Sequence, residues 1–179
     1  MEFQNIDQIY LANAQVRDRF GETIGQINAG QVKILPDGEK WSIEQIVEHV
    51  SIVDEGMAKI CRKLLGEAQK SGLKATGEIQ ISDVFRAYTE NVDEMKLEAP
   101  ERVHPTGQVS IDDSRRKLSE SHAIFESLLA VFGEFDSTNL KFPHPYFGPL
   151  SAQDWLVLAG EHMHRHTKQI EKILEKIRQ

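Results

Sequence analysis

Apolar side chains recur at steps of three and four residues in four long segments of the chain, which is the period of one helix face. The first segment, from about Ile6 to Ala29, carries a loose apolar stripe: Ile9, Val16, Phe20, Ile24 and Ile27. The second begins at Ser42, where Ser42 and Gln45 have the form of a capping box, and ends between Gly66 and Gly72. Its stripe continues over five turns: Ile46, Val50, Val53, Met57, Ile60 and Leu64.

The other two long segments lie in the second half of the chain. The third runs from about Asp112 to Phe132, with Gly133 expected to end it, and its apolar face is Leu118, Phe125, Leu128, Leu129 and Phe132. The fourth runs from Ser151, which has Asp154 three positions on as a second candidate capping box, to about Ile177. Its inward stripe is Trp155, Leu158, His162, His166, Ile170, Ile173 and Ile177.

The segments between these helices predict one further element. A shorter helix is expected from about Ile81 to Met95, inside a connection between the second and third long helices that is too long for a tight hairpin. Three prolines exclude a helix from Phe142 to Pro149, and the aromatic residues there predict a loop that folds back onto the domain. With no strand pair or repeat recognised, we expect one all-α domain over residues 1–179, a four-helix bundle whose long crossover carries the extra helix.

Composition narrows the function classes. The net charge is −7, so an acidic surface disfavours nucleic acid as a partner. The single cysteine, Cys61, excludes a disulfide within the chain, and its apolar helical neighbours predict a buried small side chain. Residues 1–10 lack the apolar core of a signal peptide and no stretch is long and apolar enough for a membrane span, so we expect a cytoplasmic protein.

Two histidines stand where the fourth helix should be apolar. His162 and His166 are one turn apart within the inward stripe, so their imidazoles can direct two nitrogens at one point. Burying two imidazoles without partners is costly, and a metal ion resolves this by binding neutral imidazole. His164 lies about 200° around the helix from His162, so we expect it on the surface. Glu161 precedes His162 without the full HExxH order, which disfavours a zincin protease.

A two-histidine site needs further ligands, and spacing alone leaves several open. His49, at the edge of the second stripe, and His122, between two apolar positions of the third, are both inward by period. Either residue alone could equally be a hydrogen-bonded core histidine. His104 and His144 lie in proline-rich loops and are weaker candidates.

Two short motifs of the chain resemble those of a known family. The stretch Trp41–Val50 resembles a motif that consists of a tryptophan, a helix start and a first histidine. The stretch Glu161–Ile170 resembles a closing motif, His-x3-His followed by Gln-Ile. Residues Gly148–Ser151 resemble the short lead into the last helix. With these motifs the chain resembles the DinB-like superfamily, which includes the YfiT-type metal-dependent hydrolases and relatives of the bacillithiol and mycothiol transferases. The segment from about Lys70 to Pro105 is longer than a minimal member needs.

The resemblance implies a metal site. By position, the resemblance assigns one divalent metal ion, zinc or nickel, to His49, His162 and His166. It does not include His122 among the ligands. Three histidines leave a coordination position open on zinc, as catalytic sites do. The implied functions are metal-assisted hydrolysis, or transfer of a low-molecular-weight thiol onto an electrophile, with a small molecule as substrate.

Three residues are weak candidates for a proton carrier near that ion. Gln45 lies one turn before His49, Glu48 adjoins it in sequence but points about 100° away, and Tyr146 lies in the aromatic loop. The alternative function is a non-catalytic bundle in which a metal ties two helices together, or which acts through dimerisation or a partner. We expect a homodimer, because family members often pair and the third apolar face, defined by Phe125, Leu128, Leu129 and Phe132, is larger than one bundle needs.

Overall fold

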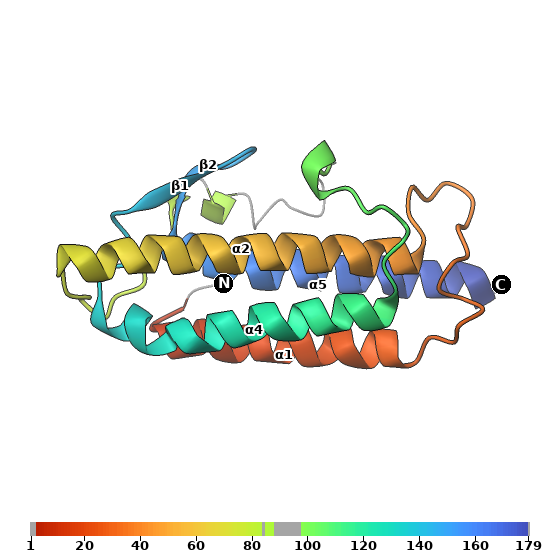
Figure 1. Ribbon diagram of the computed structural model, residues 1–179, viewed down its shortest axis with the longest axis horizontal. Coiled ribbons are helices and arrows are strands. Elements are labelled where there is room, and N and C mark those ends of the chain that lie inside the picture. The colour runs from red at the N-terminus through yellow and green to blue at the C-terminus, as the bar shows by residue number, and fades with distance from the viewer. Residues whose placement is uncertain (1–2, 84, 88–97, 179) are drawn as a thin grey trace.

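Four long helices build the protein, and the computed structural model describes residues 3–83, 85–87 and 98–178. The helices are α1 (Ile6–Gly25), α2 (Ile43–Ser71), α4 (Ile111–Glu134) and α5 (Ala152–Arg178). They share one long axis, with α2 packed against α4 and α5, and α1 packed against α5 (Figure 1). The predicted all-α four-helix bundle is confirmed.

Both predicted capping boxes are present. Ser42 Oγ accepts from Gln45 N at 3.4 Å, and Gln45 Oε1 accepts from Ser42 N at 3.0 Å, so α2 begins at the predicted residue. At the start of α5, Ser151 N donates to Asp154 Oδ2 at 2.9 Å and Asp154 N donates to Ser151 Oγ at 3.2 Å. These bonds satisfy backbone N–H groups that a helix leaves unpaired at its first turn.

The first helix is shorter than predicted. It ends at Gly25 rather than at Ala29. Asn28 Oδ1 accepts from Gly30 N at 3.1 Å and from Gln31 N at 3.2 Å, which folds the chain into a turn. A side-chain acceptor of this kind offers the backbone an alternative to the helix, so the apolar spacing beyond Gly25 misled the prediction.

The third predicted long helix is slightly longer than expected. Gly133 lies within α4, which continues to Glu134, and Phe135 N still donates to Val131 O at 2.9 Å. Phe135 then leaves the helix with an extended backbone and forms an isolated antiparallel bridge with Lys74. The helix therefore ends where the chain joins that bridge.

The predicted crossover helix, Ile81–Met95, falls largely on positions 84 and 88–97, which lie outside the described residues. Within its described part, Arg86 N donates to Ser82 O at 2.9 Å, as in a first helical turn. The crossover also contains a short 3-10 helix, η1 (Glu101–Val103), that was not predicted.

The proline-rich loop contains a strand pair, so the prediction of no strands was wrong. Strands β1 (Lys141–His144) and β2 (Gly148–Ser151) pair antiparallel, with Phe142 opposite Leu150 and Pro143 opposite Pro149. Proline lacks an N–H donor and normally signals a loop, but a two-stranded hairpin tolerates it. The prediction that this segment folds back is confirmed, because Phe147 and Leu150 are buried in the core.

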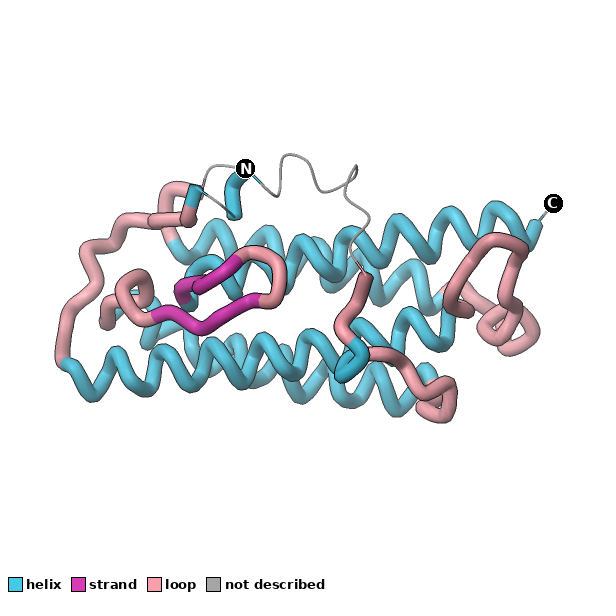
Figure 2. Tube along the Cα trace, turned by 90° about the horizontal axis from the view of Figure 1, so that it is seen from above, coloured by secondary structure: helices cyan, strands magenta, loops and turns pink. Residues whose placement is uncertain are grey.

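The hairpin and the segment around η1 lie on the same side of the bundle. Both are above α2 in Figure 1, with α1 and α4 on the opposite side, and Figure 2 shows them from above. The η1 segment lies over the first half of α2, which contains His49. This segment can therefore contact the predicted metal ligands.

The buried core is divided into two apolar clusters along the bundle. One includes Tyr10, Met57, Cys61, Phe125 and Trp155. The other includes Phe20, Ile46, Val50, Leu118, Met163 and Ile170. Polar residues separate them on α2 and α4: Asp54, Ser121 and His122. Among the described residues, no helix is long and apolar enough to cross a membrane.

Two further predictions concern the core. Cys61 is fully buried, as predicted, and burial raises the pKa of its thiol far above the ordinary value. Phe125, Leu128 and Phe132, which were expected to form a dimer face, are buried within the chain itself. This apolar face therefore no longer supports the predicted homodimer, which stays a prediction from the family resemblance.

Candidate metal centre

Three imidazoles from two helices meet on one side of the bundle. His49 comes from α2, and His162 and His166 come from α5. One ring nitrogen from each lies within 4.8 Å of the others, and His49 Nε2 is 3.2 Å from His162 Nε2. We call these three residues the histidine cluster. The structure thus brings together the three residues that the family resemblance selected.

Hydrogen bonds outside the cluster fix the tautomers of two rings. His49 Nδ1 lies 2.8 Å from the carbonyl oxygen of Val103, and His166 Nδ1 lies 2.9 Å from Gln169 Oε1. Carbonyl oxygens only accept, so each Nδ1 carries the hydrogen and each Nε2 retains its lone pair. This is how metal-binding histidines are usually oriented by their outer partners.

The surroundings keep these imidazoles neutral. Burial is the main cause of lowered pKa values at all three residues: that of His166 falls to about 3 and that of His162 falls well below the ordinary 6.5. The neighbouring rings and Arg165 lower the pKa of His162 further, since a charge on one disfavours a charge on the next. Neutral imidazole is the form that binds a metal ion.

The donor set fits a divalent transition metal. Two nitrogens bound to one tetrahedral zinc ion at about 2.0–2.1 Å lie roughly 3.3 Å apart, close to the 3.2 Å between His49 Nε2 and His162 Nε2. Imidazole nitrogens suit zinc and nickel, whereas magnesium and calcium prefer oxygen. His49, His162 and His166 would therefore hold such an ion.

Aromatic rings pack beside the cluster. The indole of Trp41 lies 4.8 Å from the ring of His49 and 5.9 Å from the ring of His104, measured between centroids. His104 Nε2 lies 2.8 Å from the carbonyl oxygen of Ala99, so it donates a hydrogen bond within the crossover. His104 is therefore a neighbour of the cluster and not a member of it.

The remaining histidines are engaged elsewhere. His164 lies outside the cluster, in agreement with the predicted helix phase, but it is half-buried and not on the surface as predicted. His144 Nδ1 accepts from Tyr146 N at 3.2 Å, and its ring stacks on that of Phe147 at 4.2 Å. His144 therefore stabilises the β1–β2 hairpin.

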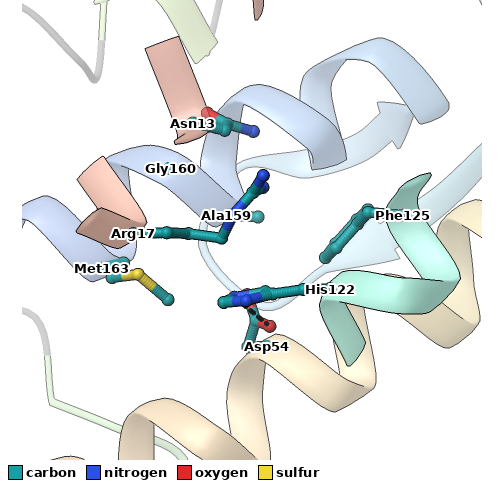
Figure 3. A pocket seen from close by; sticks show the side chains of 8 residues that line it. All are labelled: Asn13, Arg17, Asp54, His122, Phe125, Ala159, Gly160 and Met163. Carbon is teal, nitrogen blue, oxygen red and sulfur yellow. Dashed lines mark ion pairs between the residues drawn. The ribbon is translucent and has the colours of Figure 1, made fainter. Parts of the chain in front are cut away.

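His122 belongs to a second group of polar side chains in the bundle (Figure 3). Its Nε2 is 3.6 Å from Asp54 Oδ2, beyond hydrogen-bond distance, and it has no hydrogen-bond partner among the described residues. Ser121 Oγ donates to Asp54 Oδ2. We call Asp54, Ser121 and His122 the aspartate cluster. Asn13 and Arg17 of α1 approach it in Figure 3, and Asn13 donates to Leu156 O at 2.9 Å.

Protonation in the aspartate cluster differs from that of a close ion pair. Burial raises the pKa of Asp54 to about 6, although the Ser121 hydroxyl and Arg17 act in the opposite direction. Burial and the nearby Arg17 charge lower the pKa of His122 to about 4. At pH 7 a carboxylate therefore faces a neutral imidazole. This cluster offers one carboxylate and one imidazole beside a guanidinium, which is a poor cation site.

The three weak candidates for a proton carrier each make other contacts. Gln45 caps α2, and the Tyr146 hydroxyl donates to the carbonyl oxygen of Glu98. Glu48 is only 1% exposed and accepts three hydrogen bonds from Thr106 and Gly107. The expectation that the Glu48 side chain simply points away was incomplete, because it binds Thr106 and Gly107 of the crossover.

Sequence reasoning missed the two outer partners of the cluster. Gln169 lies three residues after His166, a spacing that lets side chains meet on a helix, so this signal was available. The Val103 carbonyl carried no signal, because any residue supplies a carbonyl oxygen and its position depends on the tertiary path of the crossover.

Comparison with known proteins supports the resemblance. A family model described as the DinB superfamily matches residues 12–170, which is most of the chain. This chain belongs to the DinB superfamily. It is 27% identical over 143 residues to a Bacillus subtilis (strain 168) protein named "Uncharacterized protein YuaE", and the match covers 79% of this chain and 82% of YuaE.

A solved structure shows the same fold as this DinB protein. TT2238, described as a four-helix bundle protein, matches with a TM-score of 0.60 over 92% of this chain and 96% of its own. The two sequences are 18% identical, so this likeness concerns the fold alone. The DinB superfamily and the four-helix bundle are thus established for this chain, and its three-histidine cluster is compatible with metal binding.

Proposed function

We propose that this DinB protein binds one divalent metal ion, zinc or nickel, through His49, His162 and His166, and that it is a metal-dependent enzyme. The observation that carries the proposal is the convergence of one ring nitrogen from each of three imidazoles within 4.8 Å, two of the rings having Nδ1 hydrogen-bonded to outer acceptors. Three protein ligands leave a position for a fourth group, as in catalytic zinc sites.

Residues of this chain determine the protonation state of the three imidazoles and the orientation of their rings. Burial keeps the imidazoles neutral, Val103 O and Gln169 Oε1 hold two rings in the ligating tautomer, and Trp41 packs against His49. When bound, the ion supplies Lewis acidity that lowers the pKa of a bound water or thiol. Following the family resemblance, we propose a small molecule as the substrate, taken either in hydrolysis or in transfer of a low-molecular-weight thiol to an electrophile.

A substrate screen tests the catalytic part. Zinc- or nickel-loaded protein is assayed with thiols plus an electrophilic acceptor, and separately with esters and amides. We expect turnover in one set that disappears in His49→Ala and persists in His164→Ala. Metal-loaded protein that is inactive on both sets would instead favour the non-catalytic alternative, in which the ion joins α2 to α5.

A further inference from the structure

The carboxylate of Glu48 connects the histidine cluster to the crossover. Glu48 Oε1 accepts from Thr106 N at 2.9 Å and Thr106 Oγ1 at 2.7 Å, and Glu48 Oε2 accepts from Gly107 N at 2.8 Å. Glu48 is 1% exposed, so these bonds form away from competing water. A buried carboxylate with three donors holds its loop firmly.

The same loop supplies the acceptor for His49. Val103 O lies three residues before Thr106 and accepts from His49 Nδ1 at 2.8 Å. Pro105 lies between them and restricts the backbone on both sides, with His104 in the extended conformation. The connection is short and stiff, so fixing Thr106 also fixes the direction of the Val103 carbonyl.

Gly107 shows how closely the loop is fitted to α2. Its φ is +72°, a left-handed conformation that favours glycine, and a Cβ there would lie 3.3 Å from Gln45 Nε2. Gln45 is itself held by the capping box with Ser42. The first two turns of α2 therefore face this loop at two positions: Gln45 lies close to Gly107, and Glu48 accepts hydrogen bonds from Thr106 and Gly107.

We infer that Glu48 is a positioning residue for the metal site: by anchoring Thr106 and Gly107, it places the Val103 carbonyl that keeps the hydrogen of His49 on Nδ1. This inference rests on the proposed function, because the tautomer matters to a ligand that uses Nε2. It also explains why the carboxylate of Glu48, which adjoins His49 in sequence, is buried and bonded to the loop and is not directed at the histidine cluster.

Asp154 provides a matched control. It is also 1% exposed and also accepts three hydrogen bonds that tie residues outside the helix to it: Ser82 N at 2.9 Å, Ser151 N at 2.9 Å and Ser151 Oγ at 2.8 Å. It lies on α5 two turns before His162, and none of these bonds reaches a ligand. Loss of Asp154 should therefore lower stability without altering the metal site.

The experiment compares Glu48→Gln with Asp154→Asn in the full chain. In the metal-free protein, 15N NMR of the imidazoles reports the tautomer of His49, and chelator competition then gives the zinc affinity. We expect Glu48→Gln to mix the His49 tautomers and to weaken zinc binding about 10-fold, because its amide hydrogens face the Gly107 N–H. Asp154→Asn should leave both quantities at wild-type values even if its melting temperature falls.

A second variant tests the same path without changing Glu48. Gly107→Ala strains the left-handed residue and should produce the same tautomer mixture and weakened zinc binding. Unchanged tautomer and affinity in Glu48→Gln and Gly107→Ala, with zinc still bound by the wild type, would overturn the positioning role and leave the proposed site intact. A wild type that binds neither zinc nor nickel would overturn the proposed function and this inference with it.

Discussion

Two groups of polar side chains are buried in the same bundle, and they differ in where their lone pairs point. In the histidine cluster, outer acceptors take the Nδ1 hydrogens of His49 and His166, and ring nitrogens face one another across a few ångströms. In the aspartate cluster, Asp54 already accepts from Ser121 and only one imidazole, that of His122, is nearby. Buried polar residues alone do not make a metal site, because the donors must also converge in the right tautomer.

The sharpest way to break this comparison is to remove a histidine from each cluster. His166→Ala should weaken zinc binding more than about 100-fold, since loss of an outer partner alone costs 10–100-fold. His122→Ala and His164→Ala should bind zinc like the wild type. Affinity is measured by competition with a chromophoric chelator. If His122→Ala weakened binding as much as His166→Ala, the two clusters would not be functionally distinct.

The aspartate cluster should instead affect pH-dependent stability. The folded pKa of Asp54, about 6, lies above its ordinary 3.8, so the folded state binds the proton more tightly. The wild type therefore loses stability from this group as pH rises from about 4 through 6. Asp54→Asn lacks this loss, so its stability relative to the wild type should improve by about 2 kcal/mol between pH 4.5 and 7.5.

Urea unfolding of both proteins in the presence of a chelator measures this difference. The same contribution from the histidine cluster is present in both proteins and cancels. A relative stability that stays constant or falls as pH rises would show that Asp54 is not held with a raised pKa.

A smaller effect is expected at the outer partner of His166. Gln169→Ala removes the acceptor for His166 Nδ1, so zinc affinity should fall about 10-fold. Gln169→Glu retains an acceptor oxygen at the same position and should restore most of that loss. Equal affinities for the wild type and Gln169→Ala would mean that the ring of His166 is held by packing alone.

Much of the fold prediction came from the helical period of the apolar residues. The apolar stripes predicted α2 and α5 and the inward orientation of His162 and His166. The spacing of polar residues at the helix starts predicted the capping boxes. All of these features depend on local spacing. The β1–β2 hairpin was missed because its prolines imitate a loop, and α1 was overextended because Asn28 turns the chain. Both errors come from short-range contacts that the period of apolar residues does not reveal.

The metal ligands were harder to predict from the sequence than the fold. His49 and His122 both appeared inward by period, and spacing could not choose between them. The choice came from family resemblance and depends in space on packing: α5 presents its histidines to α2 near His49, whereas His122 faces Asp54. The Glu48 connection involves residues far apart in sequence, so no local pattern could predict it.

The metal content of the protein tests the central claim most directly. The chain is purified without a histidine tag, supplied with zinc or nickel, freed of loosely bound ions and measured by elemental analysis, with His166→Ala treated in parallel. We predict close to one divalent metal ion per wild-type chain and almost none in His166→Ala. Wild-type protein that retains no metal after zinc and nickel have both been supplied would contradict the three-histidine site.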